Sequence, residues 1–117
     1  MQLVDKKNKI SLNDLKQMAE KKYGGLVKAV VDVEQKIMVI AGDMHADEET
    51  YLINLGSKQE NLWGINLYPQ NPGEEFIEFD SIINLRPKQG NLSRFVENKS
   101  LRAKIIAIVN QLIIKDE

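Results

Sequence analysis

Two runs of β-branched and aliphatic residues, separated by only two residues, limit the possible folds of this chain more than any other feature of its sequence. The runs occupy residues 26–33 and 36–41, and Glu34 and Gln35 lie between them. A connection this short joins neighbouring antiparallel strands, because parallel strands need a crossover of roughly a dozen residues or more. The sequence therefore predicts a hairpin within an antiparallel sheet.

A second hairpin is predicted farther along the chain. Residues 62–68 and 76–85 have the composition of strands, and the segment between them contains Pro69, Pro72 and Gly73. Proline and glycine interrupt a hydrogen-bonded ladder, so this segment is expected to be a loop. The two hairpins together supply four strands.

Residues 47–56 are compatible with two structures. Their acid-rich start and the terminal Gly56 are typical of a short helix, whereas residues 50–53 have the composition of a strand. Tyr51, Ile53 and Leu55 also alternate, which favours the strand. We expect a fifth strand here, with a helix as the alternative.

Helices are expected on both sides of the strands. Ser11 can accept a hydrogen bond from a free backbone N–H, Asp14 occupies the reciprocal capping position, and Gly24 with Gly25 ends the helix. The apolar positions that continue this first helix are Leu12, Leu15, Met18, Ala19 and Tyr23. Residues 100–114 form the second helix, whose apolar stripe contains Leu101, Ile105, Ile108, Val109 and Leu112.

These elements predict an α+β fold with an antiparallel sheet of four or five strands and with the N- and C-terminal helices packed on one face. Residues 1–117 are expected to form a single globular domain, in which residues 1–9 are a loosely ordered tail or an edge segment. The opposite face of the sheet is then expected to be uncovered and to meet water.

Residue types that are absent exclude several classes of function. The chain has no cysteine, which excludes disulfides, thiolate metal sites and a cysteine nucleophile. No segment resembles a secretory signal or approaches the roughly 18 apolar residues that span a bilayer, so we expect a cytoplasmic protein without a membrane partner. Residues 1–28 and 86–104 are basic and residues 32–60 are acidic. Such asymmetry can steer an anionic partner, and a self-complementary surface is the alternative.

The candidate catalytic residues lie around the only histidine. His45 is followed by Asp47, and Asp80 is expected to approach them from the second hairpin. In this interpretation His45 is a general base or metal ligand, and Asp47 and Asp80 are orienting or metal-binding carboxylates. The alternative is a solvated loop with a helix-capping aspartate, because the spacing His-x-Asp is common. The sequence assigns no metal site and no cofactor.

The candidate binding residues come from the expected uncovered face and from the basic loop over residues 86–94. Alternation along the second hairpin gathers polar side chains on one face, and the loop adds cations and amides that can hold phosphate or carboxylate. These residues are Asn66, Tyr68, Glu78, Asn84, Arg86, Asn91 and Arg94. The alternative is cross-strand pairing and a salt-bridged loop with no ligand. No aromatic residue is interleaved with the basic ones, so nucleic acid is not the expected partner.

Four blocks of sequence are distinctive: residues 28–34 (KAVVDVE), Gly42 with residues 45–47, residues 56–69 (GSKQENLWGINLYP) and residues 78–87 (EFDSIINLRP). Together they resemble a family of small prokaryotic proteins known only as a domain of unknown function. The resemblance covers residues 10–113. It implies a free-standing, single-domain cytoplasmic protein, and it implies no activity, cofactor or catalytic residue.

Two functions follow from the residues themselves. The first is a non-catalytic module that binds a small anionic ligand or a protein, including a second copy of itself, through the uncovered face and the 86–94 loop. The second is a small hydrolase-like enzyme, with or without a metal ion, built on His45, Asp47 and Asp80 and with Arg86 or Arg94 stabilising an anionic transition state. We favour the first, because one histidine without a thiol or a nucleophile elbow is a weak basis for catalysis.

Overall fold

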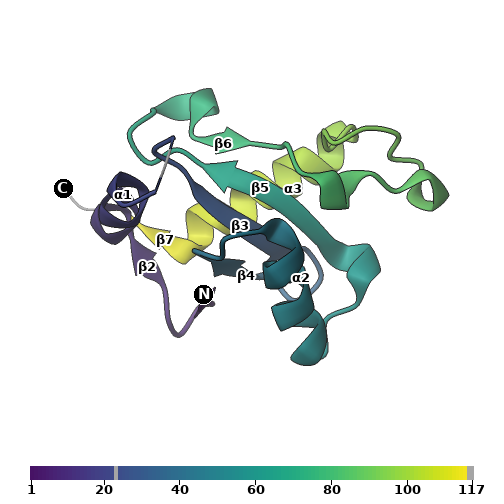
Figure 1. Cartoon of the computed structure of the whole chain (residues 1–117), viewed down its shortest axis with the longest axis horizontal. Coiled ribbons are helices and arrows are strands. Elements are labelled where there is room, and N and C mark those ends of the chain that lie inside the picture. Colours follow the sequence, from purple (N-terminus) through teal and green to yellow (C-terminus); the bar gives the residue numbers. More distant parts are fainter. Residues whose placement is uncertain (23, 116–117) are drawn as a thin grey trace.

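A computed structural model describes residues 1–22 and 24–115 and shows a five-stranded antiparallel sheet with helices on both faces (Figure 1). In the order in which they pair, the strands are β1 (Gln2–Val4), β4 (Ile37–Ile40), β3 (Val27–Asp32), β5 (Leu62–Leu67) and β6 (Ile77–Glu78). The helices are α1 (Leu12–Glu20), α2 (His45–Asn54) and α3 (Lys99–Leu112). The fold is therefore α+β, as predicted.

The first predicted hairpin is confirmed, since β3 and β4 pair with Asp32 opposite Ile37. Asp32 is buried, and its carboxylate accepts hydrogen bonds from the backbone N–H groups of Glu34 and Gln35, both at 2.9 Å. The same carboxylate accepts a 2.7 Å hydrogen bond from the Ser57 hydroxyl. One aspartate thus fixes the tight turn and ties it to the segment after α2.

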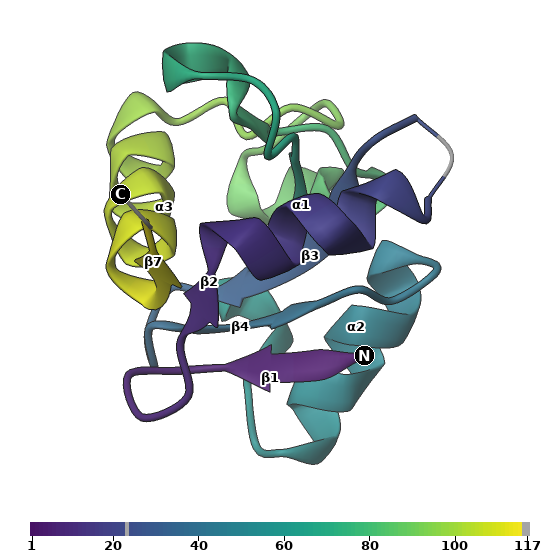
Figure 2. The ribbon, with the colours of Figure 1, turned by 90° about the vertical axis from the view of Figure 1, so that its left-hand side faces the viewer.

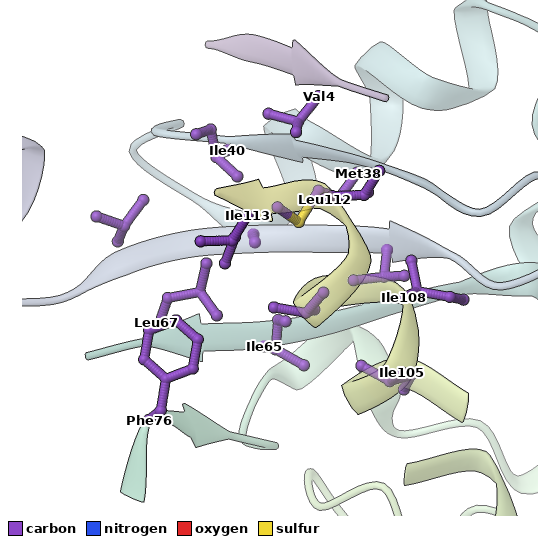
Figure 3. Packing of buried hydrophobic residues seen from close by; sticks show 14 of the residues in the cluster. Val4, Met38, Ile40, Ile65, Leu67, Phe76, Ile105, Ile108, Leu112 and Ile113 are labelled. Atoms are coloured by element: carbon purple, nitrogen blue, oxygen red, sulfur yellow. The ribbon is translucent and has the colours of Figure 1, made fainter. Parts of the chain in front are cut away.

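Helices α1 and α3 cover one face of the sheet, as expected from their apolar stripes. Figure 3 shows Ile105, Ile108 and Leu112 of α3 directed at Ile65 and neighbouring side chains of the sheet. At the start of α1, Ser11 Oγ accepts a 3.0 Å hydrogen bond from the Asp14 N–H, so the predicted cap is present. Tyr23, the last apolar position predicted for that helix, lies outside the described residues.

The strand expected over residues 47–56 is wrong and the helical alternative is correct, because residues 47–54 belong to α2. The buried positions of α2 are His45, Glu48 and Leu52, which are spaced three and four residues apart as on one face of a helix. Leu52 packs with Val30 and other buried residues on the second face of the sheet. This face is consequently not uncovered, and Figure 2 shows α2 and α3 on opposite sides of the sheet.

The strand expected over residues 76–85 is much shorter than predicted. It pairs with β5 only at Ile77 and Glu78, and at Ser81 the chain turns into a short 3-10 helix, η3 (Ile82–Asn84). Gly64 in β5 permits this crossing, because a Cβ atom there would lie 2.6 Å from the Cβ atom of Ser81. The segment therefore crosses the second face of the sheet, where η3 contacts both β5 and α2.

The two ends of the described chain are tied to the fold. Residues 2–4 form the edge strand β1 with Val4 buried, so the N-terminal segment is an edge segment of the sheet. After α3, strand β7 (Ile113–Ile114) pairs in parallel with β2 (Ile10–Ser11) and brings the end of α3 beside the start of α1. No helix within the described residues is long and apolar enough to cross a membrane.

Candidate functional site

A groove with a volume of about 1570 Å³ runs along the β6 edge of the sheet. It lies between α1 and α3 on one side and β6, the loop before β6 and residues 93–95 on the other. We call it the edge groove. Its lining includes the aromatic residues Phe76, Phe79 and Phe95 and the aliphatic residues Leu12, Ile77 and Ile106. Phe95 and Ile106 are 48% and 40% exposed, which leaves an apolar surface open to a partner.

Four of the residues predicted for a site line this groove and form two hydrogen-bonded groups. Glu78 Oε1 accepts hydrogen bonds from Asn66 Nδ2 at 2.8 Å and from the Tyr68 hydroxyl at 3.2 Å. Arg94 Nε donates a 2.8 Å hydrogen bond to Asp80 Oδ1, and both of these side chains are about half exposed. Burial, together with the charge of Glu78, raises the pKa of Tyr68, so its hydroxyl stays protonated and remains a donor.

The two walls of the edge groove carry opposite charges. On the wall formed by the helices and the chain after them lie Lys16, Arg102 and Lys115. On the wall formed by β6 and the loop before it lie the acidic residues Glu74, Glu75, Glu78 and Asp80. The Arg102 guanidinium lies 4.8 Å from the centre of the Phe95 ring and donates to the carbonyl oxygens of Val96 and Glu97. Arg102 therefore holds Phe95 at the mouth of the groove.

His45 begins α2 and lies outside the edge groove. Its Nε2 atom is 2.7 Å from the carbonyl oxygen of Ile65. A carbonyl can only accept, so Nε2 carries the proton and Nδ1 of the neutral ring is the acceptor. Burial is the main cause that lowers the pKa of His45; the hydrogen bond to Ile65 opposes this effect, Lys28 and Arg94 reinforce it, and Asp80 opposes it. Asp47, the other candidate beside His45, is exposed in the first turn of α2.

The charges around His45 predict how its titration responds to substitution. The imidazole should titrate below the ordinary value of 6.5, and this midpoint should rise in Lys28→Met and fall in Asp80→Asn. Because the folded state resists protonation of His45, the contribution of this one group to stability should decrease as the pH falls below 6.5. Imidazole NMR shifts measured against pH check both variants, and a midpoint that is unchanged in both would show that neither charge reaches the ring.

Two other predicted binding residues, Asn84 and Asn91, use their side chains to hold the chain together. The Asn84 amide accepts from the Gly64 N–H at 2.8 Å and donates to the Gly64 carbonyl at 2.9 Å, as a neighbouring strand would. Asn91 Nδ2 donates to the carbonyl oxygens of Asn84, Ser93 and Phe95. Asn84 and Asn91 are both buried. Their amides therefore fix the course of residues 84–95, which carry Arg94 and Phe95 to the edge groove.

Arg86, also predicted to bind an anion, is enclosed by groups of the protein itself. Its guanidinium donates to the carbonyl oxygens of Ile83, Gln59 and Leu62 and to the Glu49 carboxylate, the last at 3.2 Å. It also lies 4.8 Å from the centre of the Trp63 ring. The Arg86 and Glu49 side chains are only 10% and 13% exposed. Burial lowers the pKa of Arg86, and the charge of Glu49 opposes this effect.

A buried acid that sequence reasoning did not single out lies on α2 beside His45. Glu48 is buried, its Oε2 accepts a 3.0 Å hydrogen bond from the Gly42 N–H, and its Oε1 has no partner among the described residues. Burial, as the main cause, raises the pKa of Glu48 to about 9. The carboxyl is therefore neutral at physiological pH. Its spacing between His45 and Leu52 was the available signal, because it matches a buried helical face.

Other groove residues were also missed by sequence reasoning. Ile106 follows Ile105 and lies outside the apolar stripe of α3, on the side where polar residues are expected. An apolar residue at such a position was the available signal. Metal coordination has no support in the described ranges, since no three His, Asp or Glu side chains there are grouped to hold an ion.

Comparison with known proteins gives one match. The family model described as "Protein of unknown function (DUF5674)" matches residues 3–112. No curated protein and no solved structure shows a significant match. The match spans nearly the whole chain, including β6 and α3. The chain therefore belongs to the DUF5674 family of proteins of unknown function.

Proposed function

We propose that this protein is a non-catalytic binding module and that its edge groove receives a segment of a partner protein. The observation that carries the proposal is the partly exposed apolar lining of the groove, in particular Phe95 and Ile106, beside an open edge of the sheet. Exposed apolar surface of this kind, bordered by charges, is typical of protein interaction sites. The family assignment is compatible with this function and adds no activity.

The size of the groove favours a polypeptide over a small ligand. Sites for small molecules generally enclose about 300–1,000 Å³, whereas the edge groove has about 1570 Å³. Its charged residues also come from both walls. An extended segment can contact both walls at once, which a compact ligand of ordinary size cannot do.

The positions of the candidate catalytic residues support binding over hydrolysis. A hydrolase would need His45 and an arginine in one concave site. His45 lies outside the edge groove, and the guanidinium of Arg86 is directed at three carbonyl oxygens and Glu49. Arg94 does line the groove, but it is paired with Asp80. The predicted base therefore lies outside the groove, and the predicted cation inside it is already paired.

The variant Ile106→Glu should abolish partner binding and leave the fold intact. Peptides selected from a displayed random library on the parent protein should bind Ile106→Glu at least about tenfold more weakly, because a charge would be buried against the apolar segment. The matched control is Ile82→Glu, an exposed isoleucine outside the groove, which should bind as the parent does. Thermal melts establish that both variants fold. Failure to select any peptide, or equal binding to all three proteins, would contradict the proposal.

A further inference from the structure

The edge groove runs beside backbone groups of β6 that have no partner strand. Tyr68 and Phe76 form a hydrogen-bonded pair, in which the Tyr68 N–H donates to the Phe76 carbonyl at 2.8 Å. Hydrogen-bonded and non-hydrogen-bonded pairs alternate along an antiparallel ladder. Glu78 therefore bonds to Asn66 in β5, whereas the N–H and C=O of Ile77 point away from β5. β6 is the last strand of the sheet, and Figure 1 shows it along the rim.

The side chains of this rim present two different faces to an added strand. Ile77 belongs to the apolar core on the α3 side and lines the edge groove together with Phe79 and Ile106. The Glu78 side chain lies at the rim of the groove beside Asn66 and Tyr68, and among the described residues only its Oε1 is hydrogen-bonded. A strand pairing with β6 would thus place alternate side chains over the groove and the others beside the Glu78 carboxylate.

Charge argues against a second copy of this chain as the added strand. Residues 74–80 contain Glu74, Glu75, Glu78 and Asp80 and no lysine or arginine. Two copies joined along this rim would bring two such acidic segments together, and like charges on neighbouring strands are unfavourable. A segment with basic residues at alternate positions is complementary to the same rim.

We propose that the partner segment enters the edge groove as an added strand on β6, with apolar residues over the groove alternating with basic residues beside Glu78. This inference rests on the proposed function and specifies its partner, an extended apolar–basic segment. The backbone of Ile77 forms the hydrogen bonds to the added strand, and the apolar lining buries its apolar side chains. The Glu78 carboxylate favours basic residues at the alternate positions. Addition of a strand to an open sheet edge is an established mode of peptide recognition.

The test uses capped peptides that alternate lysine and valine, titrated into the isotope-labelled full chain. Saturable NMR shifts are expected at residues of the edge groove, and exchange of the Ile77 amide should slow on binding. N-methylation of the peptide residue opposite Ile77 should weaken binding about tenfold, and N-methylation of either neighbouring residue should have little effect, because only the residue opposite Ile77 bonds to β6. A peptide in which glutamate replaces lysine should bind more weakly by a similar factor.

The outcomes distinguish this inference from the proposed function. Binding that is lost in Ile106→Glu but tolerates N-methylation at all positions, with rapid exchange at Ile77, would overturn strand addition and leave the groove as a binding site. Binding of the glutamate peptide as tightly as the lysine peptide would overturn the selection by Glu78. Absence of shifts with every peptide, including those selected from the random library, would overturn both proposals.

Discussion

The Glu48→Gln variant should lose a steep dependence of stability on pH that the parent protein shows. The pKa of Glu48 is about 9 in the folded protein and near 4.5 in an unfolded chain. Between these values Glu48 takes up a proton on folding, so its contribution to the free energy of unfolding of the parent should fall by about 1.4 kcal/mol per pH unit as the pH rises. Glutamine cannot ionise and keeps an oxygen for the Gly42 N–H. Denaturant unfolding from pH 6 to pH 8 measures both slopes.

The difference in the free energy of unfolding between Glu48→Gln and the parent reports on the ionisation of Glu48 alone. The free energy of unfolding of Glu48→Gln, minus that of the parent, should increase by several kcal/mol in total between pH 5 and pH 9. At pH 5 the variant should be no more stable than the parent. The side-chain amide of glutamine also places a polar group at the position of the unpartnered Oε1, and no partner is available for it there among the described residues. Asp47→Asn is the matched control, since Asp47 is exposed one residue away, and it should keep the slope of the parent. Parallel profiles for the parent and Glu48→Gln would refute the assignment.

The parts of the fold that were predicted from the sequence depend on local patterns. The first hairpin follows from two runs of strand-forming residues around a two-residue connection, and Asp32 fixes its turn with neighbours two and three residues away. The first helix follows from Ser11 and its spacing to Asp14. In each case the deciding contacts lie within a few residues, so the sequence contains them directly.

The element at residues 45–54 was predicted incorrectly because polar residues occupy its buried face. His45 and Glu48 are buried with Leu52, and a polarity pattern counts both as exposed. Ile53 and Leu55, whose alternation favoured a strand, are 41% and 55% exposed. The protein buries a carboxyl group and exposes two aliphatic residues, which is the reverse of the polarity pattern from which periodicity predicts a helix. The environment of Glu48 depends on Gly42 and the packing of α2 on the sheet.

The candidate binding residues divide according to contacts that are distant in the sequence. Tyr68, Glu78 and Asp80, which come from the second predicted hairpin, line the edge groove together with Arg94 from the 86–94 loop. Asn84 is instead paired with Gly64, 20 residues earlier. A polar residue at a ligand site and a polar residue that hydrogen-bonds to the backbone cannot be told apart from the neighbouring sequence. Only the crossing of η3 over β5 separates them, and that crossing depends on the lack of a side chain at Gly64.

Arg86→Met should destabilise the protein strongly, by roughly 3–5 kcal/mol, which is the usual effect of removing one partner of a buried ion pair. Methionine retains apolar contact with Trp63 but leaves the Glu49 carboxylate, 13% exposed, without its cation. The carbonyl oxygens of Gln59, Ile83 and Leu62 also lose their donor. Urea unfolding of the parent and the variant at neutral pH measures the loss.

Two further variants distinguish the effect of leaving a buried carboxylate unpaired from the effect of removing any arginine. Arg94→Met removes an arginine whose ion pair with Asp80 is about half exposed, and it should change stability by less than about 1 kcal/mol. Adding Glu49→Gln to Arg86→Met should restore part of the lost stability, because the uncompensated carboxylate is then absent. Equal losses of stability in Arg86→Met and Arg94→Met would show that Arg86 is not a structural residue. Arg86 would then again be a candidate binding residue.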